Sequence, residues 1–417
     1  MRGSQTVGHV LVIVQNLPVP FDRRVWLECG ALLDDGFEVS VVCPKGRGDP
    51  NFEVLDGVRL YKYRPYAPGA KKVSFIFEYL YSFFLTAWLT VKAWRHRPIS
   101  VIQACNPPDI FWPIGLFFRV WGGTKFVFDH HDLCPELYES RFPGASRLPY
   151  WGLRLMEWCT QRSADRVIAT NESYRRIAIE RCGKEPGDVV VVRTGPDATR
   201  LQRGEPEPAL KRGRRFLVTY LGVMGPQDGV DIVVRAAETI VRDWGRDDIA
   251  FTLIGSGDCF EELVALRDEL KLQDVVEFTG RAPDELVHRI LSTADAGLSP
   301  DPKNPLNDLS TMNKTMEYMA FGLPVVAFDL RETRVSAGAA AVYAEPNGVE
   351  GFASALVDLL DDEGCRRTMG EVGRARVENE LAWDHQKQTY VHVYRDLVTK
   401  PHSGSVATVP AVSPPGA

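Results

Sequence analysis

Short apolar, β-branched runs alternate with longer stretches of helical periodicity along almost the whole chain, and this alternation restricts the fold more than any other feature. Continuous apolar runs are typical of strands buried on both faces of a parallel sheet, and the helical stretches between them supply the crossover connections. The sequence therefore predicts an α/β fold of doubly wound parallel sheets. We expect strands at 9–14, 37–43, 58–63, 101–104, 125–128, 166–169 and 189–192, and then at 216–221, 249–254, 275–278, 294–298, 324–327 and 340–343.

The two series of strands are separated by a segment of different composition. It is rich in Pro, Glu, Arg and Gly and has no apolar period, which is typical of a linker. A chain of 417 residues also has the length of two domains. We expect an N-terminal Rossmann-like domain over 1–197, a linker over 198–214, a C-terminal Rossmann-like domain over 215–382, a helix over 383–399 that is free to pack back on the N-terminal domain, and a disordered tail over 400–417.

Composition narrows the function classes. The net charge of −6 argues against a general nucleic-acid binder, and 45% hydrophobic with 25% charged residues is typical of a water-soluble globular protein. The eight cysteines form no CxxC pair, which favours buried, reduced thiols in a cytosolic protein. The first residues lack the apolar core of an export signal.

One segment raises the question of membrane contact. Residues 75–91 are strongly apolar and lie between basic residues at both ends, but they number only 17 and include Glu78, so they are marginal as a membrane span. Two interpretations remain open with equal weight. The segment is either a helix lying in the membrane interface or a helix packed in or against the domain.

The densest polar cluster of the second half runs over 304–317 and leads directly into an apolar strand. Ser310 or Thr311 is placed to cap a helix there, and the free N–H groups of a helix start attract a diphosphate. Lys314 and Glu317 are three residues apart and share a helix face, giving one cation for phosphate and one carboxylate for a sugar diol. The alternative is an exposed ion pair between these two side chains.

The stretch NKTMEYMAFGLPVVA at 313–327 resembles the nucleotide-sugar signature of family 4 of the retaining GT-B glycosyltransferases, and the flanking stretches YLGVMG, LIGSG, FTG and ADAGLSP follow in the matching order. The resemblance covers nearly the whole chain. It implies two Rossmann-like domains that face each other across a cleft. It also implies that Glu317 holds the donor ribose, Lys314 the diphosphate, and the loop at Gly280 and Arg281 the base. The donor site expected on this basis comprises Gly222, Gly225, Gln227, Gly280, Arg281, Ser310, Asn313, Lys314 and Glu317.

The sequence departs from the family pattern at the phosphate side. Leu309 stands where the family usually has its first Glu, and Val223 and Asp228 stand where Arg and Lys are common. Diphosphate neutralisation would then depend on Lys314, helix N-termini and the Gly225 backbone. The phrase GVMGPQDGVD at 222–231 resembles a bacterial subgroup that acts in O-antigen, capsule and exopolysaccharide assembly.

In the first half, the run FDHHD places Asp129, His130, His131 and Asp132 at a strand end, where α/β proteins carry their sites. Such a cluster could hold a metal, but no further group of spaced ligands accompanies it, so no metal is expected. The family resemblance instead puts His131 and Asp132 beside the transferring sugar. A capped strand end with solvated histidines is the alternative.

Two further loops follow strands of the first half. Asp22 is a plausible N-cap, and Arg23 and Arg24 behind it could meet an anionic acceptor, although surface arginines without a ligand are equally compatible. Asn106 stands in a second loop, stiffened by prolines. The acceptor-binding candidates are Arg23, Arg24, Asn106, Asp129 and His130.

Together these features predict a retaining, metal-independent glycosyltransferase without a cofactor, with His131, Asp132, Lys314 and Glu317 as its catalytic residues. The expected donor is a nucleotide-diphosphate sugar. The expected acceptor is a glycan or a polyprenyl-diphosphate-linked sugar in cell-surface polysaccharide synthesis, at the cytoplasmic face of the membrane, and no nucleic-acid partner is expected. Two alternatives remain: a catalytically silent nucleotide-sugar-binding subunit of an assembly complex, and a sugar-nucleotide 2-epimerase.

Overall fold

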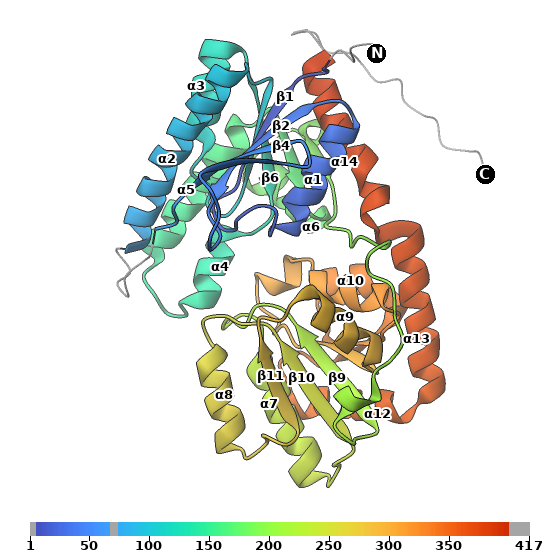
Figure 1. Ribbon diagram of the computed structural model, residues 1–417. Coiled ribbons are helices and arrows are strands. Elements are labelled where there is room, and N and C mark those ends of the chain that lie inside the picture. The colour runs from blue at the N-terminus through green and yellow to red at the C-terminus, as the bar shows by residue number, and fades with distance from the viewer. Residues whose placement is uncertain (1–5, 67–73, 400–417) are drawn as a thin grey trace, which may run out of the picture.

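The computed structural model describes residues 6–66 and 74–399, so the tail at 400–417, expected to be disordered, lies outside the described residues. The chain forms two α/β domains, one above the other in Figure 1, and each contains a sheet covered by helices. The α/β class and the two doubly wound sheets predicted from the sequence are confirmed.

The N-terminal sheet has the strand order β3-β4-β2-β1-β5-β6-β7-β8, and its neighbours are parallel except for the β3–β4 pair. Its strands are β1 (His9–Ile13), β2 (Glu38–Pro44), β3 (Phe52–Leu55), β4 (Val58–Tyr63), β5 (Val101–Cys105), β6 (Lys125–His130), β7 (Arg166–Ala169) and β8 (Val189–Val191). Strands β1 and β5 are buried at every residue because helices cover both faces. Strand β3, a short antiparallel edge strand, was not predicted from the sequence.

The helices of this domain are α1 (Arg23–Asp34), α2 (Ser74–His96), α3 (Trp112–Gly122), α4 (Cys134–Arg141), α5 (Arg147–Ser163) and α6 (Glu172–Arg176), and α6 continues as a π-helical turn, Ile177–Arg181. One apolar cluster joins one sheet face to α1 and α14, and a second joins the other face to α2 and α3. The Asp22 side chain accepts a hydrogen bond from Val25 N at 3.1 Å, which confirms the predicted cap of α1.

The C-terminal sheet has the order β11-β10-β9-β12-β13-β14, with parallel neighbours throughout. Its strands are β9 (Phe216–Leu221), β10 (Ile249–Ile254), β11 (Val276–Gly280), β12 (Ala296–Ser299), β13 (Val325–Phe328) and β14 (Ala341–Ala344). Its helices are α7 (Val230–Glu238), α8 (Phe260–Glu269), α9 (Asp284–Thr293), α10 (Asn313–Ala320), α11 (Arg331–Ala337), α12 (Val349–Asp361) and α13 (Glu363–Arg376).

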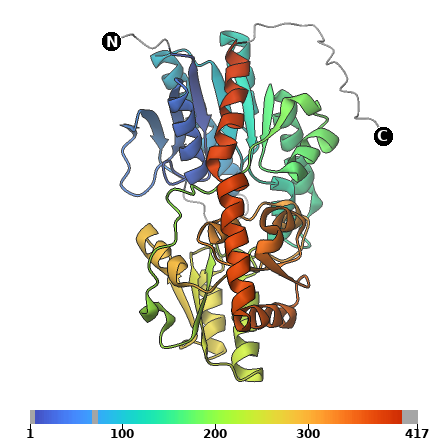
Figure 2. The ribbon, with the colours of Figure 1, turned by 90° about the vertical axis from the view of Figure 1, so that its right-hand side faces the viewer.

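The chain passes between the domains twice. The first passage precedes β9, and the second joins α13 through a π-helical turn, Val377–Leu381, to α14 (Trp383–Thr399). Figure 2 shows α13 and α14 as a nearly continuous column along both domains. Helix α14 buries Trp383, Tyr390 and Tyr394 in the core of the N-terminal domain, and Lys387 pairs with Asp34 of α1 at 2.6 Å.

Helix α2 decides between the two interpretations of the apolar segment in favour of packing on the domain, at least along one face. Leu89 and Ala93 are buried in the core, whereas Phe84 and Trp88 point outward and are 66% and 60% exposed. Among the described helices, α2 included, none has the length and apolarity needed to cross a bilayer.

All eight cysteines are free thiols. Five are buried as expected, but Cys159, Cys259 and Cys365 are only partly buried, so the prediction of buried thiols is wrong for these three.

Candidate active site

His131 and Asp132 form the corner between β6 and α4, and a buried amide holds this corner in shape. The Asn106 Oδ1 atom accepts hydrogen bonds from His131 N at 2.6 Å and from Asp132 N at 3.1 Å. The Asn106 Nδ2 atom donates to Asp132 O at 2.6 Å. Asn106 follows β5, the neighbour of β6, so adjacent strand ends position the corner. Burial raises the pKa of Asp132, although the charge of His131 opposes this.

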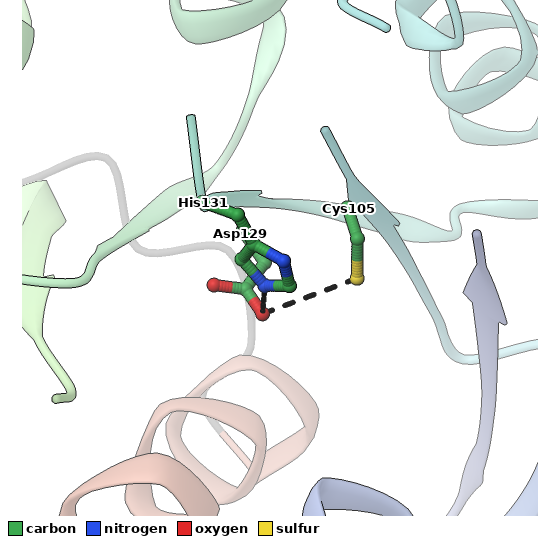
Figure 3. A group of neighbouring side chains, drawn as sticks. All are labelled: Cys105, Asp129 and His131. Carbon is green, nitrogen blue, oxygen red and sulfur yellow. Dashed lines mark hydrogen bonds and ion pairs between the residues drawn. The ribbon is translucent and has the colours of Figure 1, made fainter. Parts of the chain in front are cut away.

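Below the corner lies a buried polar network, which we call the Asp129 hub; it consists of Arg24, Glu28, Gln103, Asp129 and His131. The His131 Nε2 atom is 2.7 Å from Asp129 Oδ2 (Figure 3) and 3.0 Å from Arg24 Nε, so both hub residues hold the ring in place. The Nδ1 atom has no hydrogen-bond partner within the described chain. Burial would raise the pKa of Asp129, but Arg24, 3.0 Å away, and His131 reverse this and lower it.

The side-chain amide of Gln103 connects the Asp129 hub to helix α14 at the C-terminal end of the described chain. Gln103 Nε2 donates to Glu28 Oε2 at 2.8 Å and to Asp129 Oδ2 at 3.0 Å. Gln103 Oε1 accepts from the hydroxyls of Tyr390, at 2.7 Å, and Tyr394. Burial raises the pKa of Glu28, so Asp129 carries the negative charge that balances Arg24. Helix α14 therefore fixes the amide that orients Asp129 and, through it, His131.

Cys105, Asp129 and His131 have potential metal-ligand atoms within 4.8 Å of one another (Figure 3). The surroundings do not fit a metal ion, because the Arg24 guanidinium already balances the Asp129 carboxylate. Burial also raises the pKa of the Cys105 thiol, which opposes the thiolate form that binds metals. The expectation of a metal-independent site remains a prediction.

Four of the five acceptor-binding candidates need correction, because the structure places them beneath the surface. Arg24, Asn106, Asp129 and His130 are between 0 and 8% exposed. The donors of Arg24 are used within the protein, including Nη1 on Thr194 Oγ1 at 2.8 Å. Burial lowers the pKa of His130 to about 3, so this ring is a neutral core residue rather than a solvated one. These four residues support the corner and do not reach an acceptor.

Arg23, the remaining candidate, is exposed at the interface between the domains. Its Nη2 atom lies 2.5 Å from Asp284 Oδ1 at the start of α9. The Arg281 guanidinium lies 4.2 Å from the ring centroid of Phe21. The N-terminal end of α1 therefore faces the loop after β11, which contains the base-binding candidates Gly280 and Arg281.

On the C-terminal side, the loops after β9, β10 and β11 are stacked through their backbones. Gly222 N donates to Ile254 O at 3.0 Å, Met224 N to Ser256 O at 3.2 Å, and Gly255 N to Gly280 O at 3.0 Å. Gly255 has φ +134°, and a Cβ there would lie 1.8 Å from the Gly222 carbonyl oxygen. Only glycine lets the backbone of the loop after β10 come so close to the loop after β9. The backbone amides of these loops therefore lie together at one edge of the sheet.

Lys314 points from α10 to this loop edge. Its Nζ atom is 2.5 Å from Asp301 Oδ1 and 5.0 Å from the ring centroid of Tyr220. A Cβ at Gly222 would be 3.3 Å from its Cε atom. Burial would lower the pKa of Lys314, but Asp301 and Asp228 outweigh this and raise it, so the ammonium stays charged. The pairing with Asp301 overturns the alternative of an exposed Lys314–Glu317 pair.

Glu317 lies one turn further along α10 and faces the other domain. Burial raises its pKa, and the charge of Arg23 opposes this. No hydrogen bond or ion pair joins its carboxylate to another described residue. The carboxylate is therefore free to accept hydroxyl donors from a ligand between the domains.

The predicted cap of α10 is wrong. Met312 occupies the N-cap position without a side-chain hydrogen bond, and Asn313, the first helical residue, is exposed. The Ser310 hydroxyl instead contacts Tyr174 OH at 2.9 Å, and Thr311 Oγ1 accepts from Asn171 Nδ2 at 3.0 Å. Both side chains thus fasten the C-terminal domain to α6 of the other domain rather than closing the helix.

The structure also shows the surroundings of the three residues that depart from the family pattern, Leu309, Val223 and Asp228. Leu309 packs against the apolar cluster of the N-terminal domain, so a domain contact replaces the absent carboxylate. Val223 is exposed. Burial raises the pKa of Asp228 to about 6, and its Oδ2 atom accepts from Gly225 N at 2.8 Å. Gln227 donates to the same oxygen at 3.1 Å.

Two cavities lie outside this interface. One of about 870 Å³ adjoins the C-terminal end of α10 and is lined by residues that include Arg203, Arg366 and Arg374. These arginines bond backbone carbonyls, such as Ala294 O and Leu201 O, and so act in the packing of the domain. The other, of about 350 Å³, lies where the chain passes between domains.

Two residues of the Asp129 hub were not predicted from the sequence. Gln103 stands inside a fully buried strand, and Glu28 lies beside Val25 and Cys29 on the buried face of α1. A polar residue in such a position needs a buried partner, which is a usable signal. The partners Tyr390 and Tyr394 had no signal, because they come from a helix 287 and 291 residues further along the chain than Gln103.

Comparison with known proteins identifies the two domains. Residues 22–200 match the family described as Glycosyltransferase Family 4, and residues 215–362 match Glycosyl transferases group 1. The D-inositol 3-phosphate glycosyltransferase of Kribbella flavida is 26% identical over 246 residues, 56% of this chain and 57% of its own. That of Kineococcus radiotolerans is 27% identical, over 57% of this chain and 58% of its own. The chain thus spans less than two thirds of either relative.

Solved structures show the same fold along almost the whole chain. Sucrose-phosphate synthase from Thermosynechococcus elongatus has a TM-score of 0.77 at 18% identity, covering 94% of this chain and 99% of its own. The Anabaena protein HepE in complex with UDP-glucose has a TM-score of 0.68 at 16% identity, covering 92% and 98%. The two family matches together cover more than three quarters of the chain. The chain therefore belongs to the glycosyltransferases with the GT-B fold.

Proposed function

We propose that the protein is a retaining glycosyltransferase that moves a sugar from a nucleotide-diphosphate sugar to an acceptor held by the N-terminal domain. The observation that carries this proposal is the meeting of two sets of groups at the domain interface. Lys314, Glu317 and residues 222–225, which we call the glycine loop, come from one domain, and His131 and Asp132 come from the other. HepE, a protein of the same fold, was solved with UDP-glucose, which agrees with such a donor.

The chemistry asks little of the protein beyond placement and charge. The nucleoside diphosphate is a good leaving group, so stabilisation of the charge that develops on it is the main task, and Lys314 and the backbone amides near Gly225 serve it. The unpaired Nδ1 atom of His131 is suited to a hydroxyl of the transferring sugar. The departing phosphate accepts the proton of the acceptor hydroxyl, so no close carboxylate pair is required.

Donor binding gives the first test. A panel of UDP, GDP, ADP and dTDP sugars is screened by thermal unfolding, because a true donor stabilises the folded protein by mass action. Glu317→Gln is expected to weaken binding of the selected donor about tenfold, since one charged hydrogen-bonding group is lost. Glu371→Gln on α13 is the exposed control and is expected to bind as the wild type does. Equal affinity of the Glu317 variant and wild type would refute the assignment.

An acceptor at a membrane surface is supported by one face of the N-terminal domain, which we call the aromatic face. Helices α2, α3 and α5 lie side by side there in Figure 1. Their exposed apolar side chains are Phe77, Leu80, Phe84, Trp88, Trp94, Phe117, Val120, Trp121, Leu148, Trp151, Leu155 and Trp158. Exposed basic residues of the same helices include Lys92, Arg95 and Arg147. Aromatic side chains with basic neighbours suit the interface of an anionic bilayer, where a polyprenyl-diphosphate-linked acceptor resides.

Sedimentation with vesicles tests this part separately. We expect binding to vesicles that contain phosphatidylglycerol and weaker binding to phosphatidylcholine alone. Phe84→Ser with Trp88→Ser is expected to lower the bound fraction at least fivefold, whereas Phe52→Ser on the edge strand β3 is the control. A dimer in light scattering that the double variant abolishes, without vesicle binding, would assign the face to a second copy of the chain instead.

A catalytically silent nucleotide-sugar-binding subunit is the second candidate. The specific observations that favour it are Leu309 in place of an acid and Asp228 beside Lys314. Donor binding without transfer to any glycan or lipid-linked acceptor would establish this candidate. A 2-epimerase is separated by incubating donor without acceptor and looking for an epimeric sugar.

A further inference from the structure

Among the described residues, the phosphate side of the proposed donor site carries no net positive charge, because acidic side chains balance its one lysine. Lys314 is paired with Asp301 at 2.5 Å, and Asp228 faces the same ammonium. Two carboxylates thus share one cation at the place where a diphosphate must bind. A second cation would strengthen the electrostatic interaction with this ligand beyond what Lys314 and the backbone amides supply.

Lys314 and Asp258 both lie near the glycine loop. Gly222 adjoins Lys314, because a Cβ at Gly222 would lie 3.3 Å from the Lys314 Cε atom. Cys259 N donates to Met224 O at 2.9 Å, and a Cβ at Gly257 would meet the same oxygen at 2.6 Å. Asp258, between Gly257 and Cys259, therefore lies near the same loop as Lys314.

Arg141 of the N-terminal domain reaches this position. It is the last residue of α4, which points from the N-terminal domain toward the C-terminal domain in Figure 1. Its Nη2 atom is 2.8 Å from Asp258 Oδ2. Its charge acts both on Asp132 in its own domain and on Asp228 across the interface. The guanidinium thus lies between the His131–Asp132 corner and the glycine loop.

The ion pair with Asp258 is of the kind that a ligand can replace. The two side chains are 34% and 72% exposed, and solvent-exposed pairs contribute little to stability. A phosphate offers the same guanidinium two oxygens in a planar, bidentate arrangement.

We propose that Arg141 is a donor-binding residue that exchanges Asp258 for the diphosphate of the nucleotide sugar. It supplies from the opposite domain the cation missing at positions 223 and 228. This inference rests on the proposed function, because it assigns a further contact at the same donor site. It also makes the donor a bridge between the two domains.

Isothermal titration with the nucleoside diphosphates UDP, GDP, ADP and dTDP tests the proposal on the full-length protein. For whichever of them binds, Arg141→Ala is expected to raise Kd about 10- to 100-fold, the effect of losing hydrogen bonds between two charged groups. Arg141→Lys is expected to recover part of this loss. Asp258→Asn, which releases the guanidinium, is expected to lower Kd severalfold.

Three controls distinguish contact from a structural effect. The matching nucleoside, which has no phosphate, is expected to bind wild type and Arg141→Ala equally. Arg166→Ala removes a similarly exposed pair with Asp188 at the opposite end of the sheet and is expected to leave Kd unchanged. Unchanged melting temperatures of the ligand-free variants establish that they fold.

Two results overturn the inference in distinguishable ways. If wild type binds a nucleoside diphosphate and Arg141→Ala binds it equally well, the role of Arg141 is refuted and the proposed function stands. If wild type binds none of the four, both are refuted.

Discussion

Arg23 and Arg24 are neighbours in the sequence, and the structure predicts opposite consequences for their replacement by methionine. Arg24 is 8% exposed, lies 2.9 Å from Glu28 and makes its ion pair with Asp129 at 3.0 Å. Removing one partner of a buried ion pair leaves an uncompensated charge and costs about 3–5 kcal/mol. Arg23 and its partner Asp284 are 56% and 67% exposed, and such a pair is worth about 0–1 kcal/mol.

The free energy of unfolding of the N-terminal domain is measured by urea denaturation of wild type, Arg24→Met and Arg23→Met. We expect Arg24→Met to lose about 3 kcal/mol or more and Arg23→Met to lose less than about 1 kcal/mol. Methionine keeps the aliphatic volume of either side chain, so the comparison isolates the charge. Similar losses for the two variants would refute the view that Arg24 is the buried counter-ion of the hub.

The pH dependence provides a second check on the same variant. The pKa of Asp129 is lower in the folded protein than its ordinary value of 3.8. The stability that its ionised form contributes is therefore fully present above pH 3.8 and is lost as the pH falls toward the folded pKa. Arg24→Met removes most of this contribution. The stability difference between wild type and variant is expected to shrink as the pH is lowered below about 4.

Three further predictions concern other parts of the site. The double variant Tyr390→Phe, Tyr394→Phe is expected to lower kcat about five- to tenfold with little change in donor KM. The reason is that the two lost hydrogen bonds, of about 1 kcal/mol each, position the hub and do not touch the donor. An unchanged kcat in steady-state kinetics would contradict this. Burial raises the pKa of Asp228 to about 6, so protonation below that pH removes a negative charge beside the diphosphate. Nucleoside diphosphate affinity should accordingly improve severalfold from pH 7.5 to 5.5 in wild type, and titration should show a smaller improvement in Asp228→Asn; identical profiles would exclude this role. Gly255→Ala places a Cβ 1.8 Å from the Gly222 carbonyl oxygen and is expected to cost about 2–4 kcal/mol, with loss of donor binding. A wild-type melting temperature for this variant would show that the stacked loops do not need glycine there.

The fold was largely predictable because each buried strand carries its own signal. Strands such as β1 and β10 are apolar at nearly every residue, and this reflects a local requirement for burial on both faces. The edge strand β3 lacks this requirement, since it alternates between exposed and partly buried residues. Its sequence signal is the Asp56–Gly57 turn before β4, a dipeptide favoured in tight hairpins.

The candidate residues came from two kinds of signal. His131 follows the buried strand β6, whereas Lys314 and Glu317 lie on α10 and were selected by their shared helix face and by the family resemblance. The burial of Arg24 beside an exposed Arg23 depends on helix rotation, which turns adjacent side chains about 100° apart. Its spacing of four residues from Glu28 was a clue to a shared face. No local pattern connects Gln103 with a helix at the other end of the chain.

The two interdomain passages lie against each other, and this has a mechanical consequence. Trp383 N donates to Pro196 O at 3.1 Å, and a Cβ at Gly195 would lie 2.3 Å from Leu381 O. The two adjacent segments therefore form a hinge at one side of the domain interface. Rotation of the domains about this hinge displaces most the contacts that lie farthest from it. Any side chain larger than that of glycine at position 195 would push the two segments apart and change the direction of the hinge axis.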